Sequence, residues 1–315
     1  MLFRREGTEI FMGHLEEIEE IGNIEKHYEV LGMMGDGGQG DLYLARELRT
    51  GRRVAVKTQK ARTVGSSSAH RSAGRYLLEE GKRMLKLTGI DEIPEIFASG
   101  TYRNRRCLVM EYIDGPQLRD SWAEAKPVRV PETVASVIGQ LCEILEKVHD
   151  RKLVHGDLKP ENVIVEPDGR LRLIDMGHAV EEGKRTEWDH GTFGYSAPEQ
   201  WDSSPHGLTC RADIFSLGCI LLEMTVMSLP YGGMEERVTR HHPVLPPDRL
   251  EAIPVEFRDL ALHMVRWDAA ERPAGVREVF ERIRRYLPEP GSRRRPSKRL
   301  KPDTTEYWRA RPPRP

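Results

Sequence analysis

The residues best suited to chemistry lie close together at positions 155–163, in the sequence HGDLKPENV. Asp157, Lys159 and Asn162 place a carboxylate, an ammonium group and an amide within six positions, and Asp175 follows a later apolar run. This combination suits phosphoryl transfer, in which Asp157 would accept the proton of an attacking hydroxyl and Lys159 would neutralise charge on the moving group. Asn162 and Asp175 offer the oxygen ligands that Mg²⁺ prefers.

A glycine-rich segment, GDGGQG, occupies residues 35–40. Glycines let a backbone close over phosphates and present N–H groups to them. The spacing alone is weak evidence, because dinucleotide-binding folds use it between a strand and a helix. Here the pattern predicts strands at 28–31 and 42–45, and a third strand at 54–57 follows the turn at residues 50–51. That context favours a phosphate-binding loop between two strands.

Lys57 ends the third predicted strand, where it can contact the α- and β-phosphates of a nucleotide. It needs a carboxylate to orient it, and Glu79 and Glu80 of the next predicted helix are the candidates. Glu80 shares a helical face with the apolar residues at 77, 84 and 87, which favours it over Glu79. Residues 62–75, between Lys57 and this helix, indicate a long loop rich in Ser, Gly and Arg.

Two predicted elements position the cluster at 155–163. Apolar residues at helical spacing from Val134 onward predict a long amphipathic helix that ends near His149. A hairpin over 163–174, turning at residues 168–169, would place Asp175 at the end of its second strand. Asp and Asn are ordinary loop residues, so each candidate alone is uninformative, and only the combination with Lys57 argues for a site.

These segments together resemble eukaryotic-type (Hanks-type) serine/threonine protein kinases, and residues 35–45 and 195–218 look most similar to the bacterial branch. Three more segments carry the resemblance: GTFGYSAPE at 191–199, DIFSLG at 213–218, and Arg-Pro at 272–273. The likeness implies an α+β, bilobal protein kinase fold. Its smaller lobe would be a mostly antiparallel β-sheet with one helix, and its larger lobe would be mainly helical.

The resemblance also implies a role for each site residue. Thr192 would bridge Asp157 and Lys159, Asp213 would bind the backbone of the catalytic loop, and Arg272 would pair with Glu199. The catalytic set would be Asp157, Lys159, Lys57, Glu80 and Thr192, and the metal ligands would be Asn162 and Asp175. The nucleotide would contact Gly35, Gly37, Gly38, Gly40, Leu42, Ala55, Lys57, Met110, Glu111, Ile113 and Ile164.

The implied function is a serine/threonine protein kinase that transfers the γ-phosphoryl group of ATP, with Mg²⁺ or Mn²⁺, to protein substrates. Lys159, two residues after the base, marks Ser/Thr rather than Tyr specificity in this family. A pseudokinase or nucleotide-binding scaffold without turnover stays open as the alternative. A small-molecule phosphotransferase would not need the segment at 191–199. A docking role for the basic C-terminal tail could coexist with catalysis.

Two residues, Gly156 and Met176, depart from the family pattern, and the role of Thr186 depends on the first of them. Gly156 stands where many relatives carry an Arg that pairs with a phosphorylated activation-loop residue. Thr186 is the only hydroxyl residue between His178 and His190. We therefore hypothesise that basal activity does not require a phosphate at Thr186. Met176 replaces the usual Phe of the metal-binding turn and is apolar enough to fill the same slot.

Length and composition set the remaining expectations. A chain of 315 residues with 38% hydrophobic content can bury a substantial core, and a net charge of −1 argues against nucleic acid as a partner. No apolar run approaches the roughly 18 residues of a membrane span, so we expect a cytoplasmic protein. Three of the four cysteines lie in apolar runs and read as small buried thiols: Cys107, Cys142 and Cys219.

The resemblance and the composition together divide the chain. Residues 1–27 form an N-terminal extension whose acidic stretch, 16–25, predicts a short helix. The kinase domain is expected at 28–287, with lobes at 28–110 and 116–287 joined by a hinge at 111–115. Residues 288–315 are rich in Pro and Arg and predict a disordered tail, with docking onto an acidic partner as the alternative to a solvated tail.

Overall fold

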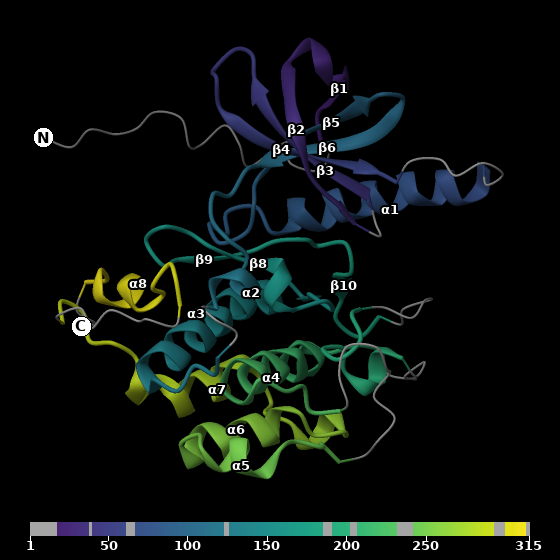
Figure 1. Cartoon of the computed structure of the whole chain (residues 1–315). Helices are drawn as coiled ribbons and strands as arrows, with labels where there is room; N and C mark the ends of the chain where they lie inside the picture. The colour runs from purple at the N-terminus through teal and green to yellow at the C-terminus, as the bar shows by residue number, and fades with distance from the viewer. Residues whose placement is uncertain are drawn as a thin grey trace, which may run out of the picture. The chain divides into compact units, whose positions relative to one another are not determined.

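The computed structural model describes residues 18–37, 40–60, 67–122, 126–184, 191–201, 207–231, 242–292 and 300–312. The chain divides into two compact units, Met1–Tyr112 and Ile113–Pro315. The boundary falls inside the segment 111–115 that the sequence predicted as a hinge. A β-sheet with one long helix makes up the first unit, and helices dominate the second (Figure 1). The predicted fold class is confirmed.

The first unit is built on a six-stranded sheet in the order β1-β5-β6-β4-β3-β2. Its strands are β1 (Glu20–Asn23), β2 (Tyr28–Gly37), β3 (Gly40–Glu47), β4 (Arg53–Gln59), β5 (Ile96–Tyr102) and β6 (Arg105–Glu111). β1 pairs with β5 in parallel, and the other neighbours are antiparallel. A short 3₁₀ helix, η1 (Ile24–Lys26), follows β1, and α1 (Ser67–Lys86) packs against β4 and β6.

Strand register separates the two faces of this sheet. Leu42 lies opposite Lys57, and Ala55 lies opposite Met110. Because side chains alternate between faces, these four residues share one face of the sheet. The opposite face forms a hydrophobic core that includes Tyr43, Ala45, Val54, Val56 and Val109. The strand register therefore places these four residues, all predicted to contact a nucleotide, on the face away from this core.

Two local predictions in the first unit are wrong. Residues 20–26 form β1 and η1 instead of the helix predicted for the acidic stretch. The reason is tertiary, since the amide of Ser99 donates to the carbonyl of Glu19 and the side chain of Ile24 is buried in the core. Helix α1 also begins at Ser67, inside the predicted loop 62–75.

The second unit is organised around α4. Its helices are α2 (Leu118–Ser121), α3 (Pro131–Asp150), α4 (Cys210–Val226), α5 (Pro247–Glu251), α6 (Val255–Met264), α7 (Val276–Ile283) and α8 (Thr305–Arg309). Residues 212–226 of α4 are all buried, which is the pattern of a helix enclosed on every side. Helices α3 and α6 pack on α4, and α7 packs on α3. Pro131 opens α3, where a missing N–H costs nothing.

Short elements connect these helices. The 3₁₀ helices are η3 (Pro160–Asn162), η4 (Pro198–Gln200), η5 (Ala269–Glu271) and η6 (Arg284–Tyr286). The strands are β7 (Leu153–Val154), β8 (Val163–Val165), β9 (Leu171–Leu173) and β10 (Val180–Glu181). β8 pairs with β9 and β7 with β10, both antiparallel. The long helix and the hairpin predicted from the sequence are both present, as α3 and β8–β9.

The prediction of a disordered tail from residue 288 is wrong for residues 300–312. They include α8, which lies beside α3 (Figure 1), and the side chains of Leu300 and Trp308 are buried. Two apolar anchors and several ion pairs therefore outweigh the basic, Pro-rich composition. Thr304 and Thr305, which a disordered tail would expose to modification, are also buried. The Arg-rich residues 293–299 lie outside the described residues.

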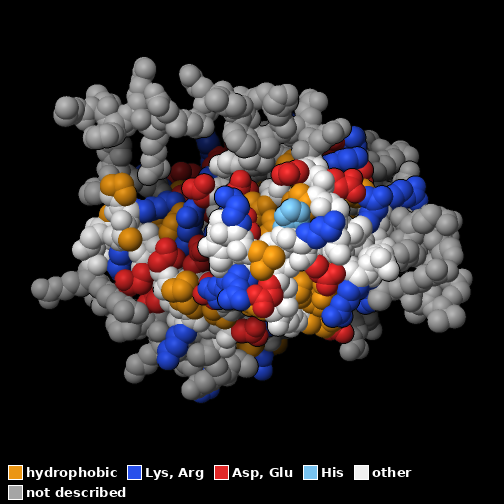
Figure 2. Space-filling view, turned by 90° about the horizontal axis from the view of Figure 1, so that it is seen from above, with side chains coloured by type: hydrophobic (Ala, Val, Ile, Leu, Met, Phe, Trp, Pro, Cys, Tyr) orange, Lys and Arg blue, Asp and Glu red, His pale blue; other side chains and the backbone are white. Residues whose placement is uncertain are grey.

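The cysteines and the membrane expectation can be checked directly. Cys107, Cys142 and Cys219 are buried free thiols, as predicted, and burial raises the pKa of Cys107 to about 12. Among the described helices, none is both long and apolar enough to cross a membrane. On the face seen in Figure 2, Lys and Arg side chains are interspersed with Asp and Glu, so no single-sign patch dominates that view.

Candidate active site

A closed triangle of hydrogen bonds holds the predicted catalytic side chains of the second unit. Thr192 Oγ1 donates to Asp157 Oδ1 at 2.7 Å. Lys159 Nζ donates to Asp157 Oδ2 at 2.8 Å and to Thr192 Oγ1 at 2.6 Å. The bridge predicted for Thr192 is present. Because each group bonds to the other two, the carboxylate and the ammonium are held within one hydrogen-bonded set before any substrate binds.

Asn162 extends this set from the end of η3. Its Nδ2 donates to the backbone carbonyl of Asp157 at 2.8 Å and to Asp157 Oδ2 at 3.1 Å. Both bonds use the amide nitrogen, which leaves the amide oxygen as the atom suited to a cation. The η3 turn that carries Asn162 begins at Pro160, whose fixed φ favours the start of a helical turn.

Asp213, at the start of α4, fixes the backbone of the same loop. Its carboxylate accepts the amide N–H of His155 at 2.8 Å and of Gly156 at 2.9 Å, and its other bond is to His149 Nε2 at 2.8 Å. Burial alone would raise the pKa of Asp213, but the bond to His149 and the backbone N–H donors hold that pKa below its usual range. The predicted contact between Asp213 and the loop is confirmed, and His149 is a partner that the sequence did not reveal.

Gly156 is required by the geometry of the loop. Its φ is +74°, and a Cβ atom there would lie 2.8 Å from the carbonyl oxygen of His178. Its own carbonyl accepts a hydrogen bond from Gln200 Nε2 at 2.7 Å. An arginine at this position would combine a strained backbone with a backbone clash. The departure from the family pattern therefore has a local structural cause.

The hairpin β8–β9 brings the two predicted metal ligands to one end. Asn162 precedes β8, Asp175 follows β9, and the amide of Ile174 donates to the carbonyl of Asn162 at 2.9 Å. Asp175 has a φ of +67°, and its Oδ1 accepts the amide N–H of Gly177 at 3.1 Å. The next residue, Met176, is buried.

The donor chemistry at this end of the hairpin fits a hard cation. Mg²⁺ is usually held by one or two carboxylates together with substrate phosphates, and it does not need a cage built wholly from protein. One amide oxygen and one carboxylate match that need. Within the described ranges, no group of three or more His, Cys, Asp and Glu side chains forms a separate metal cluster.

In the first unit, Lys57 and Glu80 form the predicted pair. Lys57 Nζ donates to Glu80 Oε1 at 2.7 Å, and the two side chains are only 13% and 4% exposed. Glu79 instead pairs with Lys82 on the exposed side of α1. The helical-face argument for Glu80 is confirmed. The lack of a side chain at Gly40 lets the start of β3 lie close to the backbone of β4, since a Cβ there would lie 1.8 Å from the carbonyl oxygen of Thr58.

A buried ion pair links two distant parts of the second unit. Arg272 Nη1 donates to Glu199 Oε1 at 2.6 Å, and Arg272 Nη2 donates to Glu199 Oε2 at 2.8 Å. Arg272 also donates to three backbone carbonyls, those of Arg266, Trp267 and Arg211, and its guanidinium lies over the ring of Phe215. The predicted pair is confirmed, and it fixes the end of the segment that begins with Thr192.

Comparison with known proteins gives the same family as the resemblance in the sequence. Residues 28–282 match the protein kinase domain. The chain belongs to the protein kinase family. It is 28% identical over 310 residues to the serine/threonine-protein kinase pkn2 of Myxococcus xanthus, covering 87% of this chain and 36% of that protein.

Two other kinases are similar at the same level. The chain is 30% identical over 280 residues to human cyclin-dependent kinase-like 5, covering 86% of this chain and 27% of that protein. It is 27% identical over 254 residues to the serine/threonine-protein kinase PknB of Mycobacterium leprae, covering 76% of this chain and 40% of that protein. The chain thus spans well under half the length of each of these relatives.

The residues predicted to contact a nucleotide divide between the two units of this kinase. The first unit holds Gly35, Gly37, Gly40, Leu42, Ala55, Lys57, Met110 and Glu111, and the second holds Ile113 and Ile164. Gly38 and Thr186 lie outside the described residues.

Sequence reasoning missed a polar network beside the catalytic loop. Arg119 of α2 donates to Glu161 Oε1 at 2.9 Å and also binds Glu223 and the hydroxyl of Tyr195, which itself donates to Glu223. Burial and Glu223 raise the pKa of Tyr195, while the bond to Glu223 raises the pKa of Arg119 although burial alone would lower it. Glu223 was the available signal, because it interrupts the most apolar stretch of the chain.

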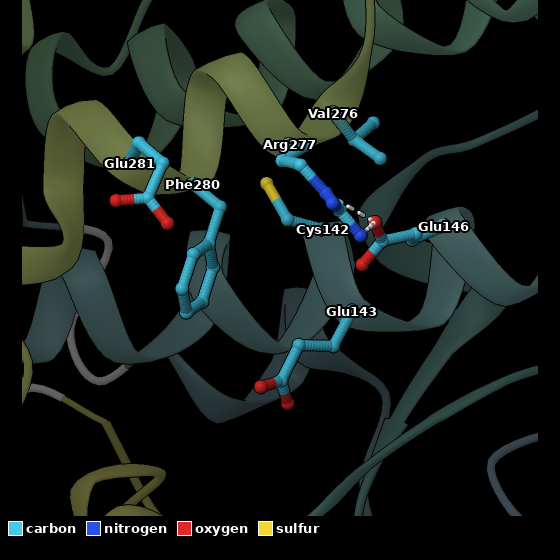
Figure 3. Close-up of a pocket in the computed structure, with 7 residues that line it drawn as sticks. All are labelled: Cys142, Glu143, Glu146, Val276, Arg277, Phe280 and Glu281. Atoms are coloured by element: carbon cyan, nitrogen blue, oxygen red, sulfur yellow. Dashed lines mark hydrogen bonds and ion pairs between the residues drawn. The ribbon is translucent and has the colours of Figure 1, made fainter.

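A cavity of about 240 Å³ lies between α3 and α7, apart from these catalytic residues (Figure 3). It is lined by Cys142, Glu143, Glu146, Val276, Arg277, Phe280 and Glu281. Its carboxylates are already paired, with Arg311, Arg277 and Arg284. The cavity therefore offers no uncompensated charge to a ligand.

Proposed function

We propose that this chain is a serine/threonine protein kinase that transfers the γ-phosphoryl group of ATP to Ser and Thr hydroxyls of proteins. The hydrogen-bonded triangle of Asp157, Lys159 and Thr192 carries the proposal. It holds a base and a cation together, which is the arrangement that an attack by a neutral hydroxyl requires. The serine/threonine-protein kinases to which the chain is similar support the proposal.

In the proposed reaction, the substrate hydroxyl oxygen bonds to the γ-phosphorus while the bond from that phosphorus to the β–γ bridging oxygen breaks. ADP leaves, and the hydroxyl proton passes to the carboxylate of Asp157. Lys159 neutralises charge on the transferring group, and Thr192 keeps both side chains in place. Lys57, oriented by Glu80, neutralises charge on the α- and β-phosphates.

The proposed metal ligands are the oxygens of Asn162 and Asp175, and the ion is Mg²⁺, with Mn²⁺ as a substitute. A bound cation would neutralise phosphate charge and orient the leaving group. The hairpin supports this assignment because one backbone hydrogen bond, from Ile174 to Asn162, joins the two flanks.

The proposed nucleotide site comprises the remaining residues that the resemblance implies. The glycines of segment 35–40 would cover the phosphates, Met110 would lie behind the adenine, and the backbone at Glu111 and Ile113 would bind the base. Leu42, Ala55 and Ile164 would supply apolar contacts to it. The common sheet face of Leu42, Ala55, Lys57 and Met110 supports this assignment.

The wider proposal covers domain limits, partners and location. The kinase domain is proposed at 28–287, acting on proteins with Ser or Thr acceptors, with no nucleic acid partner. Free, unpaired thiols are typical of a reducing compartment, which supports a cytoplasmic location. An acidic partner for the Arg-rich residues 293–299 stays a proposal.

The test is phosphate transfer from labelled Mg·ATP to the protein itself and to a generic basic protein, with and without a chelator. We expect label on Ser or Thr that disappears when Mg²⁺ and Mn²⁺ are removed. Mg²⁺-dependent ATP binding without any transfer would favour the pseudokinase alternative. Transfer to Tyr alone would contradict the assignment of specificity.

A further inference from the structure

The segment 300–312 lies outside the residues that match the protein kinase domain, yet it is built into the second unit. Trp308 Nε1 donates to the backbone carbonyl of Ser136 in α3 at 3.1 Å, and the Trp308 side chain is only 3% exposed. Arg311 pairs with both carboxylate oxygens of Glu143 at 2.8 Å each. Figure 1 shows α8 beside α3.

The same segment touches the turn of the β8–β9 hairpin. A Cβ atom on Gly169, at that turn, would lie 2.2 Å from the carbonyl oxygen of Asp303, so the two backbones are in close contact. Gln140 of α3 joins them, since its Nε2 donates to the carbonyls of Gly169 at 3.0 Å and Thr304 at 3.4 Å. The Oε1 of Gln140 accepts the amide N–H of Leu171 at 2.9 Å.

The hairpin held in this way is the one that carries the proposed metal ligands. β8 and β9 have three residues each, and a two-stranded hairpin of that length is not stable alone in water. Its open end bears Asn162 and Asp175, and its closed end lies against Gln140 and the 303–304 backbone. β8 is also held on its other edge, where the amide of Val165 donates to the carbonyl of Pro116 at 2.9 Å. Because the strands are so short, loosening of the closed end can still change the spacing between Asn162 and Asp175.

We propose that residues 300–312 are a positioning element for the metal site, which clamps the β8–β9 turn against α3 so that Asn162 and Asp175 keep their spacing. This rests on the proposed function, because it assigns the hairpin to the binding of Mg·ATP. Trp308 and Arg311 anchor the clamp to α3, and Gln140 transmits it to the hairpin.

The experiment compares the wild-type chain with its Trp308→Ala variant in two measurements. The first is hydrogen exchange of residues 163–174, which needs no catalysis. The second is the free Mg²⁺ concentration that gives half-maximal ATP binding. We expect faster exchange in the hairpin and a Mg²⁺ requirement raised by about fivefold or more, with a smaller change in ATP binding when no cation is present. Should Trp308→Ala not fold, Arg311→Ala removes the ion pair with Glu143 and the cation–π contacts with Tyr307 and Trp308, and it keeps the buried Trp308 side chain.

Phe257→Leu is the matched control, because Phe257 is buried in α6 and its ring packs on Tyr286, away from the hairpin. It should lower stability without changing either measurement. Unchanged hairpin exchange in Trp308→Ala would overturn the inference, and so would an equal effect from Phe257→Leu. If wild type shows no Mg²⁺-dependent ATP binding, the proposed function fails, and hairpin exchange alone still decides whether the segment clamps the turn.

Discussion

Gly156 illustrates how one backbone position limits what the catalytic loop can contain. Its left-handed φ and the nearby carbonyl of His178 leave no room for a side chain. We predict that Gly156→Ala lowers the free energy of unfolding by about 1–3 kcal/mol, as measured by denaturant titration. Gly32→Ala is the control, since Gly32 is exposed in β2, its φ lies outside the left-handed region and no atom lies within 4 Å of a Cβ there, so this substitution should not lower the free energy of unfolding.

A Gly156→Ala protein as stable as wild type would contradict this account of the loop. The same geometry bears on regulation, because an arginine clamp for a phosphorylated residue cannot occupy position 156 without strain. This geometry supports the hypothesis that basal activity needs no phosphate at Thr186, because the arginine that would bind such a phosphate is absent. Thr186 itself lies outside the described residues.

His178 should make stability depend on pH in the mildly acidic range. Burial lowers the pKa of His178 below its ordinary value of 6.5, although Asp157 and Asp175 act to raise it. The unfolded chain therefore binds a proton at a pH where the folded chain does not, so stability is fully present above about 6.5 and is lost as pH falls towards the lowered pKa. We predict that His178→Gln flattens this loss when unfolding is measured from pH 7 to pH 5. An unchanged slope in the variant would contradict the assignment.

At the scale of elements, the pair of Glu199 and Arg272 joins η4 to the region before α7. The Arg272 side chain is fully buried, so removing its partner leaves an uncompensated charge. We predict that Glu199→Ala lowers the free energy of unfolding by about 3–5 kcal/mol in denaturant titration. Arg285 and Glu256 form an exposed pair with a similar separation, and Glu256→Ala should lower the free energy of unfolding far less than Glu199→Ala. Equal losses from the two substitutions would contradict the role given to burial.

The elements that position the site could be predicted where their pattern is local. The apolar periodicity of α3 and the turn between β8 and β9 both appear in the structure, as does the pairing of Lys57 with Glu80. Residues 20–26 could not be predicted in the same way, because the edge of β5 and the core around Ile24 decide their conformation. Tertiary contacts outweighed local helical spacing there.

The prediction of disorder for residues 300–312 is wrong because the composition of this segment carries no local sign of a helix or a core. Its basic residues find partners on α3, where Arg309 contacts Glu132 and Arg311 contacts Glu143. A sequence window cannot show that acidic residues about 170 positions earlier complement an Arg-rich end. The available signal in the sequence was Trp308 itself, because disordered tails contain few aromatic residues. In the structure its side chain is buried.

On the scale of the whole molecule, the chain combines two units that each hold part of the predicted chemistry. The first unit supplies the pair of Lys57 and Glu80, and the second supplies the triangle around Asp157. The chain spans well under half the length of the relatives that it matches. We propose that these groups together perform phosphoryl transfer.

The most direct test is single-turnover transfer from Mg·ATP by wild type, Asp157→Asn and the control Asp259→Asn, whose carboxylate is exposed on α6. We predict that Asp157→Asn slows transfer by about 10²–10⁴-fold while Mg·ATP binding persists, because the substitution removes the proton acceptor and its charge beside Lys159 but leaves the residues proposed to bind Mg·ATP unchanged. Asp259→Asn should match wild type. Transfer by Asp157→Asn at the wild-type rate would contradict the assignment of Asp157 as the catalytic base.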